Sequence, residues 1–588
     1  MKLRNLWLAA AAATSLAAMS ACKSDEALGV ANTDNPDVER AFATPDGVEN
    51  VLKNGYLQIF GATHGSSTAI WPAAQATALE SYGSVANFGL NIRGAIPRGV
   101  IDNTRGNPTA AENYRDFQQL FLRGRLIANA IGAFDVQLAA GRSIGTAFQD
   151  QRARSYGFFA LAMANAEGAL MYDSVSVLDP TLERLEIPPL SGYKEAMVIA
   201  LQQLDSAIVV ANRARTATGS SASALTGFLP VEWMRTATTP TSLDDYIRLI
   251  RSTKARFRAG VARNATERAA VNWNEVVNDA ASGITSDWVL DLNSNAGWAA
   301  AWLSQMAVAS SWSGMTPAII GMADTTGGYA NWISLPRGDR APFLIRTPDA
   351  RFPTGTTRAE QTTNSPALAA SLPSVYFRSR PPGEDILGEA YGNSYYDHVR
   401  FTSYRQGANI GKWVWMSRAE SEMLQAEGLL RLGRDAEAVP LINRTRKANG
   451  IGEFPLGSTA TTRAPNYPGA PAVPPNPPTD PVGKPAIAPG GPNSCVPRTP
   501  TGPGGTLECG TLFEAMKWEK RMETLYTGYS QWFFDSRGWN DLPVGSPLMY
   551  PVPYQEKDAR YEGSYNGQSG DPIWQATANT YGFGVGSR

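Results

Sequence analysis

The sequence predicts a mainly α-helical fold in which pairs of helices pack together and long irregular loops connect them. Four segments in the first half, 112–132, 151–172, 191–212 and 243–263, repeat apolar residues at helical spacing. Residues 416–449 contain two more helical stretches with a glycine-containing break between them. These patterns recur along the chain and favour a scaffold built from helix pairs.

The first predicted helix begins near residue 44. Thr44 is suited to cap the helix, Pro45 to occupy its first position and Asp46 to lie in its first turn. The helix is expected to continue to about Phe60. Apolar residues then recur on one face at Val48, Val51, Leu52, Tyr56 and Ile59.

Small residues mark segment 151–172 as a close-packing helix. Ala153, Gly157, Ala160 and Ala164 leave room for a neighbouring backbone, so we expect antiparallel pairs here.

Residues 416–449 span 34 positions, the length of a tetratricopeptide-type unit. Gly433 is expected to end the first helix, and Pro440 to lie in a kinked first turn of the second. A helical hairpin with no kinship to that repeat is the alternative.

The segment from about 457 to 510 differs in composition, with 14 prolines in the 39 residues of 465–503. Neither a helix nor a central strand persists through such a sequence, so an extended surface loop is predicted. We interpret it as a spacer; a docking ligand for a partner is the alternative.

The N-terminus has the layout of a secretory signal. Lys2 and Arg4 precede an apolar run from Leu6 to Ala18, which is too short to span a bilayer. Small residues followed by Cys22 resemble a bacterial lipoprotein signal, although Met19 stands where leucine is usual. The sequence thus predicts a signal peptide (1–21), a lipidated Cys22 and a polar tether (22–40), followed by one domain (41–588). An ordinary signal peptide is the alternative.

Export also sets the expectation for the other cysteines. Cys495 and Cys509 form an even pair in an oxidising compartment, and a disulfide between them would close a loop at the end of the proline-rich segment.

The 52 basic residues are balanced by 53 acidic ones. This balance offers no basic field for nucleic acid, so no nucleic-acid partner is expected.

Charges and aromatic rings are densest at 519–542. Residues 512–526 have helical spacing, with charges gathered on one face that is expected to be solvated. Residues 532–545 are expected to form a compact turn. Asp535 and Arg537 lie among tryptophans there. We expect each to be partnered inside an aromatic core, since a catalytic carboxylate pair facing a cleft is the rarer arrangement.

Motifs for other chemistry are missing from the sequence. The chain has two histidines, His64 and His398, and lacks the spacings typical of metal sites, phosphate loops and nucleophile elbows. No metal, cofactor or catalytic residue is therefore predicted. Two functions are compatible with this composition: a surface glycoside hydrolase that uses two of the many carboxylates, and a structural adhesin.

Eight residues between 519 and 539, in the segment dense in charges and rings, resemble the C-terminal signature of the SusD/RagB family of outer-membrane nutrient-uptake lipoproteins. Pro551, Pro553 and Glu556 match a later element of that family, and 422–450, 43–56 and 347–353 resemble earlier ones. Thr527 and Gln531 depart from the pattern, and one residue is inserted before Trp532. We call the matching residues the C-terminal signature: Glu519, Arg521, Glu523, Gly528, Trp532, Asp535, Arg537 and Trp539.

The resemblance implies a tetratricopeptide-like scaffold that is lipid-anchored on the surface of the outer membrane. It also implies a SusC-like TonB-dependent transporter as partner, a glycan or peptide as ligand, and no catalysis.

A sugar's apolar face stacks on an aromatic ring while polar groups bind its hydroxyls. The candidate sugar-binding residues lie on segments outside the helix stripes, and a subset of them is expected to form one shallow platform. They are Trp71, Tyr82, Asn91, Arg93, Trp298, Trp302 and Trp332.

Overall fold

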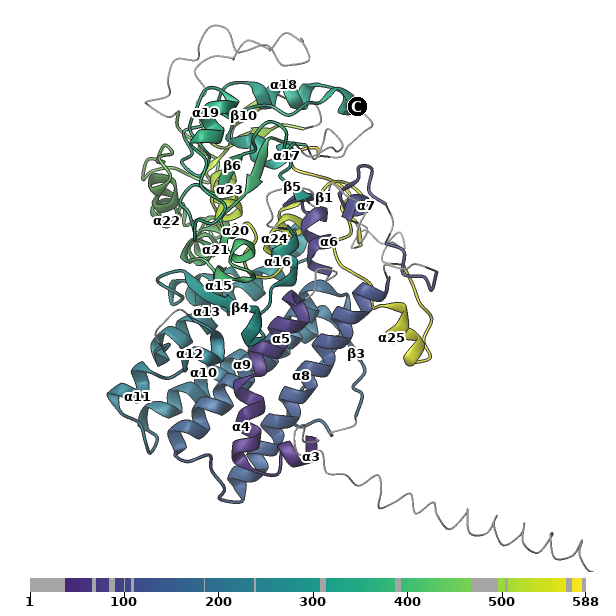
Figure 1. The fold of residues 1–588 in the computed structure, drawn as a ribbon, viewed down its shortest axis with the longest axis vertical. Coiled ribbons are helices and arrows are strands. Elements are labelled where there is room, and N and C mark those ends of the chain that lie inside the picture. Colours follow the sequence, from purple (N-terminus) through teal and green to yellow (C-terminus); the bar gives the residue numbers. More distant parts are fainter. Residues whose placement is uncertain are drawn as a thin grey trace, which may run out of the picture.

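The computed structural model describes residues 38–583 except 66–69, 84–89, 100, 107–109, 184–185, 237–239, 307–312, 386–392, 467–494, 503–505 and 567–573. The described part is mainly helical with a few short strands, which confirms the predicted fold class (Figure 1). The predicted signal peptide, Cys22, most of the tether and the centre of the proline-rich segment lie outside the described residues.

The chain begins with three short helices, α3 (Val38–Ala41), α4 (Pro45–Lys53) and α5 (Gly55–His64). Thr44 caps α4 by accepting a hydrogen bond from the backbone N–H of Gly47, and Pro45 opens the helix, both as predicted. The single helix expected to run on to Phe60 is wrong, because the chain breaks at Asn54 and restarts as α5.

The four apolar stripes form α8 (Ala110–Ala139), α9 (Ala147–Met171), α10 (Tyr193–Arg213) and α13 (Leu243–Gly260). Figure 1 shows α4, α5, α8, α9 and α10 side by side in the lower half of the molecule, where they pack on one another. The small residues permit this packing: a Cβ added to Gly124 of α8 would lie 2.8 Å from the Cβ of Ala164 of α9.

The helical hairpin predicted at 416–449 is present as α21 (Arg418–Arg431) and α22 (Asp435–Ala448). Gly433 joins the two helices with φ +70°, a backbone conformation that glycine adopts without strain. Pro440 was predicted in the first turn of α22, but it lies deeper in the helix. Helix α22 begins as early as Asp435 because acidic residues there, Asp435 and Glu437, favour its N-terminus.

The strands make five two-stranded antiparallel sheets within the described ranges. The longest joins β4 (Trp288–Asn293) to β8 (Ile410–Met416), so that Asp291 lies opposite Lys412. The other pairs are β1 (Tyr82–Gly83) with β5 (Ser313–Gly314), β2 (Ser174–Ser176) with β3 (Leu190–Gly192), β6 (Phe377–Ser379) with β7 (Tyr396–His398), and β9 (Arg498–Pro500) with β10 (Leu507–Cys509).

The C-terminal signature lies on α23 (Leu512–Thr524), α24 (Gln531–Trp539) and the link between them. Two details differ from prediction. The expected compact turn at 532–545 is largely the helix α24. The charged face of α23 is buried rather than solvated, because helices of the upper half and the C-terminal segment cover it.

Cys495 and Cys509 form the expected disulfide, with their Cα atoms 5.7 Å apart. The disulfide lies beside the β9–β10 pair and closes the end of the proline-rich segment.

Short helices complete the structure, and most of them lie between the long elements. The α-helices are α6 (Ile70–Thr77), α7 (Leu90–Gly94), α11 (Ala222–Thr226), α12 (Val231–Met234), α14 (Ala265–Ala269), α15 (Trp273–Ala281), α16 (Ala301–Met306), α17 (Pro317–Ile320), α18 (Gly328–Ser334), α19 (Arg358–Thr363), α20 (Thr402–Gln406) and α25 (Tyr554–Ala559). The 3₁₀ turns are η2 (Ala214–Thr216), η3 (Ser294–Ala296), η4 (Gly321–Ala323) and η5 (Arg337–Asp339).

Candidate functional site

The acidic residues of α23 are held by arginines from two other segments. Arg351 lies 2.8 Å from Asp349 and 3.1 Å from Glu519. It also contacts Glu523 at 3.2 Å, and Arg446 lies 3.6 Å from Glu519. Burial raises the pKa of Glu519 to about 7, against the two arginines, which lower it. These contacts fix α23 to the preceding chain.

The cations of α23 are paired as completely as its acids. Lys520 lies 2.7 Å from Asp535 of α24, and Lys517 lies 2.8 Å from Asp541. Arg521 pairs with the same Asp541. Each of these side chains is buried, so the network acts as an internal brace between α23, α24 and the following loop.

Arg537 donates to backbone carbonyls instead of a carboxylate. Its guanidinium donates to the carbonyl oxygens of Leu548 at 2.8 Å and Gly260 at 2.9 Å. The pKa of Arg537 lies well below its usual range, mainly because the guanidinium is buried. The indole N–H of Trp532 donates to the carbonyl of Arg521 at 2.8 Å, and that of Trp539 donates to Glu427 at 3.0 Å. The buried contacts of the C-terminal signature thus stabilise the scaffold.

The predicted aromatic platform is wrong in this structure, because all five candidate rings are buried. Trp71 of α6 and Trp302 of α16 lie with ring centroids 3.8 Å apart. Trp298 packs on Phe60, with centroids 5.2 Å apart. Trp71, Trp302 and Trp332 lie on the short helices α6, α16 and α18 rather than on irregular segments. Their rings fill the core because large aromatic side chains gain most from burial. Exposed fractions are Trp71 0%, Tyr82 5%, Trp298 1%, Trp302 0% and Trp332 2%.

The remaining candidates lie on other elements than this cluster of rings. Asn91 and Arg93 lie on α7, and Arg93 is half-buried; the side chain of Asn91 lies outside the described set. Trp332 lies on α18, under the guanidinium of Arg340 at 4.5 Å. The structure does not bring the seven candidates together into one site.

Titratable groups with shifted pKa values surround the buried rings. His64 contacts Trp71 edge to face at 4.6 Å, and burial lowers its pKa to about 3. Burial raises the pKa values of Glu80 and Glu167 to about 8. Glu80 accepts a hydrogen bond from the backbone N–H of Tyr526 at 2.8 Å, which links this cluster to the end of α23.

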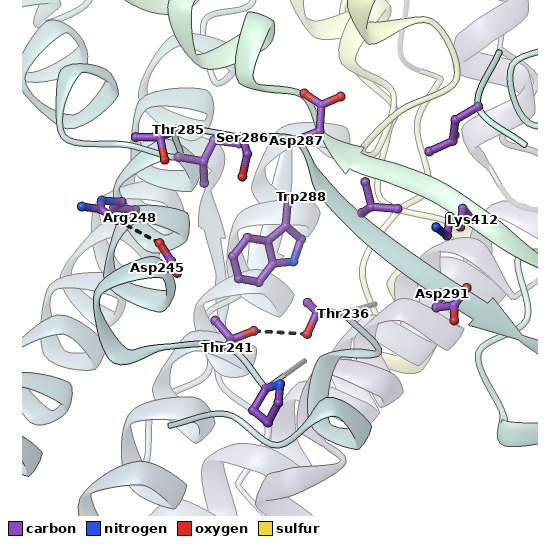
Figure 2. Close-up of a pocket in the computed structure, with 14 residues that line it drawn as sticks. Thr236, Thr241, Asp245, Arg248, Thr285, Ser286, Asp287, Trp288, Asp291 and Lys412 are labelled. Atoms are coloured by element: carbon purple, nitrogen blue, oxygen red, sulfur yellow. Dashed lines mark hydrogen bonds and ion pairs between the residues drawn. The ribbon is translucent and has the colours of Figure 1, made fainter. Parts of the chain in front are cut away.

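An open pocket of about 400 Å³ lies elsewhere, between α13, the loop 284–287 and the β4–β8 pair (Figure 2). We call it the β4–β8 pocket. Ten of its lining side chains are labelled in Figure 2, where the indole of Trp288 lies between the Asp245–Arg248 pair and the two strands. The full lining is Thr236, Pro240, Thr241, Asp245, Arg248, Ile284, Thr285, Ser286, Asp287, Trp288, Val289, Asp291, Leu372 and Lys412.

An irregularity in β4 lies at the pocket. The strand register shifts between Trp288 and Val289, so these consecutive residues both line the pocket. Without the shift their side chains would point to opposite faces of the sheet. Trp288 is 8% exposed, and its indole N–H has no hydrogen-bond partner within the described part of the chain.

The pocket was not predicted from the sequence. The segment Trp288–Asn293 alternates buried and half-buried residues, which is the ordinary pattern of a strand with one face in the core. The pairing of β4 with β8, more than a hundred residues later, is what places Lys412 beside Asp291. The one local signal was the polar run Thr285–Asp287 directly before a tryptophan.

The described ranges contain no group of three or more His, Cys, Asp or Glu side chains arranged to hold a metal ion. Within the same ranges, no helix has both the length and the apolar composition that crossing a bilayer requires.

No family model matches the sequence, and no curated protein matches it either. Solved structures do match. A SusD homolog from Parabacteroides distasonis aligns with a TM-score of 0.50 and 12% identity, over 87% of this chain and 93% of that chain. A SusD/RagB family protein from Bacteroides thetaiotaomicron gives 0.46 and 15%, over 88% and 94%. A SusD-like carbohydrate-binding protein from Bacteroides vulgatus gives 0.37 and 13%, over 70% and 76%.

The chain has the SusD-like fold, which confirms the predicted resemblance at the level of architecture. The alignment with the Parabacteroides distasonis homolog carries this assignment, since it spans nearly all of both chains.

Proposed function

We propose that the protein is a nutrient-binding lipoprotein of the outer-membrane surface. Lipid on Cys22 anchors it, and it captures a glycan, or alternatively a peptide, for a SusC-like TonB-dependent transporter. The SusD-like fold, the C-terminal signature and the lipoprotein-type signal support this function together. Fold alone does not define function, so the site must supply the rest.

The observation that carries the proposal is the β4–β8 pocket on this scaffold. It is open to solvent and lined by hydroxyl, carboxylate and cationic side chains around one indole ring. A volume of about 400 Å³ falls within the range of small-ligand sites, roughly 300–1,000 Å³. Polar groups of both hydrogen-bonding types around an aromatic ring are what a sugar requires.

The commitment of the signature's acids to ion pairs favours a receptor over the hydrolase alternative. Glu519, Glu523 and Asp535 each contact a cation and are buried. A glycosidase needs two carboxyl groups facing a substrate on either side of the bond it cleaves. The acids of the C-terminal signature instead join helices.

Anchoring and partnership are tested together in the native membrane. The tagged full chain is expected to incorporate labelled palmitate and to co-purify with a TonB-dependent barrel protein. Cys22→Ser should abolish the label and release the protein from the membrane while leaving ligand binding unchanged. Retention of label and membrane association by this variant would contradict the proposed anchor, and purification without any barrel protein would contradict the proposed partner.

A further inference from the structure

The β4–β8 pocket offers bonding groups that the fold does not use. Trp288 lines the pocket, and its buried indole N–H has no hydrogen-bond partner among the described residues. Asp291 and Lys412 lie opposite each other on β4 and β8, and the side chain of neither has a hydrogen bond or ion pair to any described residue. An unpaired buried donor costs about 1–3 kcal/mol, so a site that retains one is suited to a ligand that supplies the acceptor.

The other charges of the pocket are already engaged. Asp245 pairs with Arg248 at 2.9 Å. Asp287 accepts the backbone N–H of Arg418 at 2.8 Å and faces Arg400 at 3.6 Å. Thr236 and Thr241 share a hydrogen bond at 3.1 Å. The groups left for a ligand are therefore one indole donor, one carboxylate acceptor, one ammonium donor and the hydroxyls of Thr285 and Ser286.

This set contains one free carboxylate and one free ammonium and so favours neither a cationic nor an anionic ligand. Vicinal hydroxyls satisfy it well, because each hydroxyl both donates and accepts. One hydroxyl can donate to Asp291 while accepting from Lys412, and a ring or hydroxyl oxygen can accept from Trp288. The apolar side chains of Ile284, Val289 and Leu372 suit the C–H face of the same ring.

We infer that the β4–β8 pocket binds an uncharged saccharide unit, with Trp288, Asp291 and Lys412 as the residues that recognise its hydroxyls. This inference rests on the proposed function and gives it a site distinct from the buried rings around Trp71. The pocket's size suits the end or a short segment of a chain.

The test uses the chain from residue 23 onward, titrated by calorimetry with uncharged mono- to hexasaccharides of glucose, galactose, mannose and xylose. Matched uronic-acid oligosaccharides and tri- to hexapeptides form the other two arms. Trp288→Phe keeps the ring and removes the N–H, and it is expected to weaken binding of the best uncharged sugar about three- to tenfold. Asp291→Asn should weaken it at least tenfold, since hydrogen bonds to charged groups are stronger.

Trp302→Phe is the matched control. Its indole N–H is also buried and unpartnered within the described residues, but it lies in the cluster with Trp71, outside the pocket. This variant should bind like the parent. Lys412→Gln, at an exposed position, keeps the inference testable if Trp288→Phe unfolds; it should weaken binding about three- to tenfold.

The outcomes separate the inference from the proposed function. Sugar binding that Trp302→Phe weakens, but the three pocket variants do not, overturns the pocket and leaves the receptor function standing. If only peptides or only uronic-acid oligosaccharides bind, the inference that the ligand is an uncharged saccharide is wrong. If no arm binds, both the inference and the proposed function fail.

Discussion

Arg268 of α14 and Glu427 of α21 form a two-pronged ion pair that is completely buried. Their contacts are 3.0 Å from Nε to Oε1 and 2.6 Å from Nη2 to Oε2. The same guanidinium reaches Asp535 of α24 at 3.0 Å, so one arginine ties the helical hairpin to the C-terminal signature. Glu427 ends with a pKa far below its usual range because Arg268 outweighs the cost of burial.

We therefore expect Glu427→Gln to destabilise the protein by about 3–5 kcal/mol, since it leaves a buried cation with part of its charge uncompensated. Urea unfolding followed by circular dichroism measures the change. Glu437→Gln on α22 is the control, because it breaks a pair of similar length, 2.7 Å to Arg434, that is exposed to water. The control should change stability little. Equal effects of the two variants would contradict the bracing role.

Close contact between α8 and α9 predicts opposite effects for two glycine-to-alanine changes. Gly124→Ala places a methyl group 2.8 Å from the Cβ of Ala164, a rigid atom, and should destabilise by about 1–3 kcal/mol. Gly61→Ala in α5 meets open space and should stabilise by about 0.4–1 kcal/mol through the unfolded chain. Thermal unfolding distinguishes the two, and stabilisation by both would show that the helices are further apart than described.

The disulfide between Cys495 and Cys509 predicts a stability loss on its removal. The two cysteines are 14 positions apart, and a loop of this size contributes roughly 3 kcal/mol in the chain-entropy model. The double change to serine should lower the free energy of unfolding by about that amount. Thiol labelling of the denatured, unreduced chain from residue 23 onward should find no free cysteine, and two labelled thiols would disprove the bond.

Burial of Glu80 predicts a pH-dependent stability. Its pKa is about 8 in the folded protein and near 4.5 when unfolded, so between these values the folded state holds a proton that the unfolded state has lost. Its contribution to stability therefore falls as the pH rises from about 4.5 to 8. Glu80→Gln mimics the protonated form and removes this dependence.

The stability advantage of Glu80→Gln over the parent should accordingly grow across that pH range, by on the order of a few kcal/mol. Urea titrations at pH 5, 6.5 and 8 measure it. His64 titrates in both proteins, so its contribution cancels in the difference. An advantage that is constant with pH would show that Glu80 ionises normally.

The sequence predicted the elements whose signals are local. Thr44 and Pro45 located the start of α4, and Gly433 located the break between α21 and α22. The partnering of Asp535 was also predictable, since a carboxylate among rings requires a cation. The identities of its two cations were not: Lys520 lies 15 residues earlier, but Arg268 comes from 267 residues earlier in the chain.

The site escaped prediction for the same reason. Tryptophans on irregular segments were expected at the surface, but Trp71 and Trp302 meet in the core because α6 and α16 pack together. Trp288 appeared to be an ordinary strand residue, but the register of β4 shifts directly after it, and Trp288 lines a pocket together with Lys412 from a strand far along the chain. Long-range pairing of this kind leaves no trace in local periodicity.

The central claim is that this SusD-like protein binds a glycan without cleaving it. The most direct measurement incubates the chain from residue 23 onward with the uncharged oligosaccharides, recording bound ligand by calorimetry and fragments by mass spectrometry over a day. We predict saturable binding and recovery of every oligosaccharide at its original length. Shortened products that increase with time and protein concentration would contradict the claim.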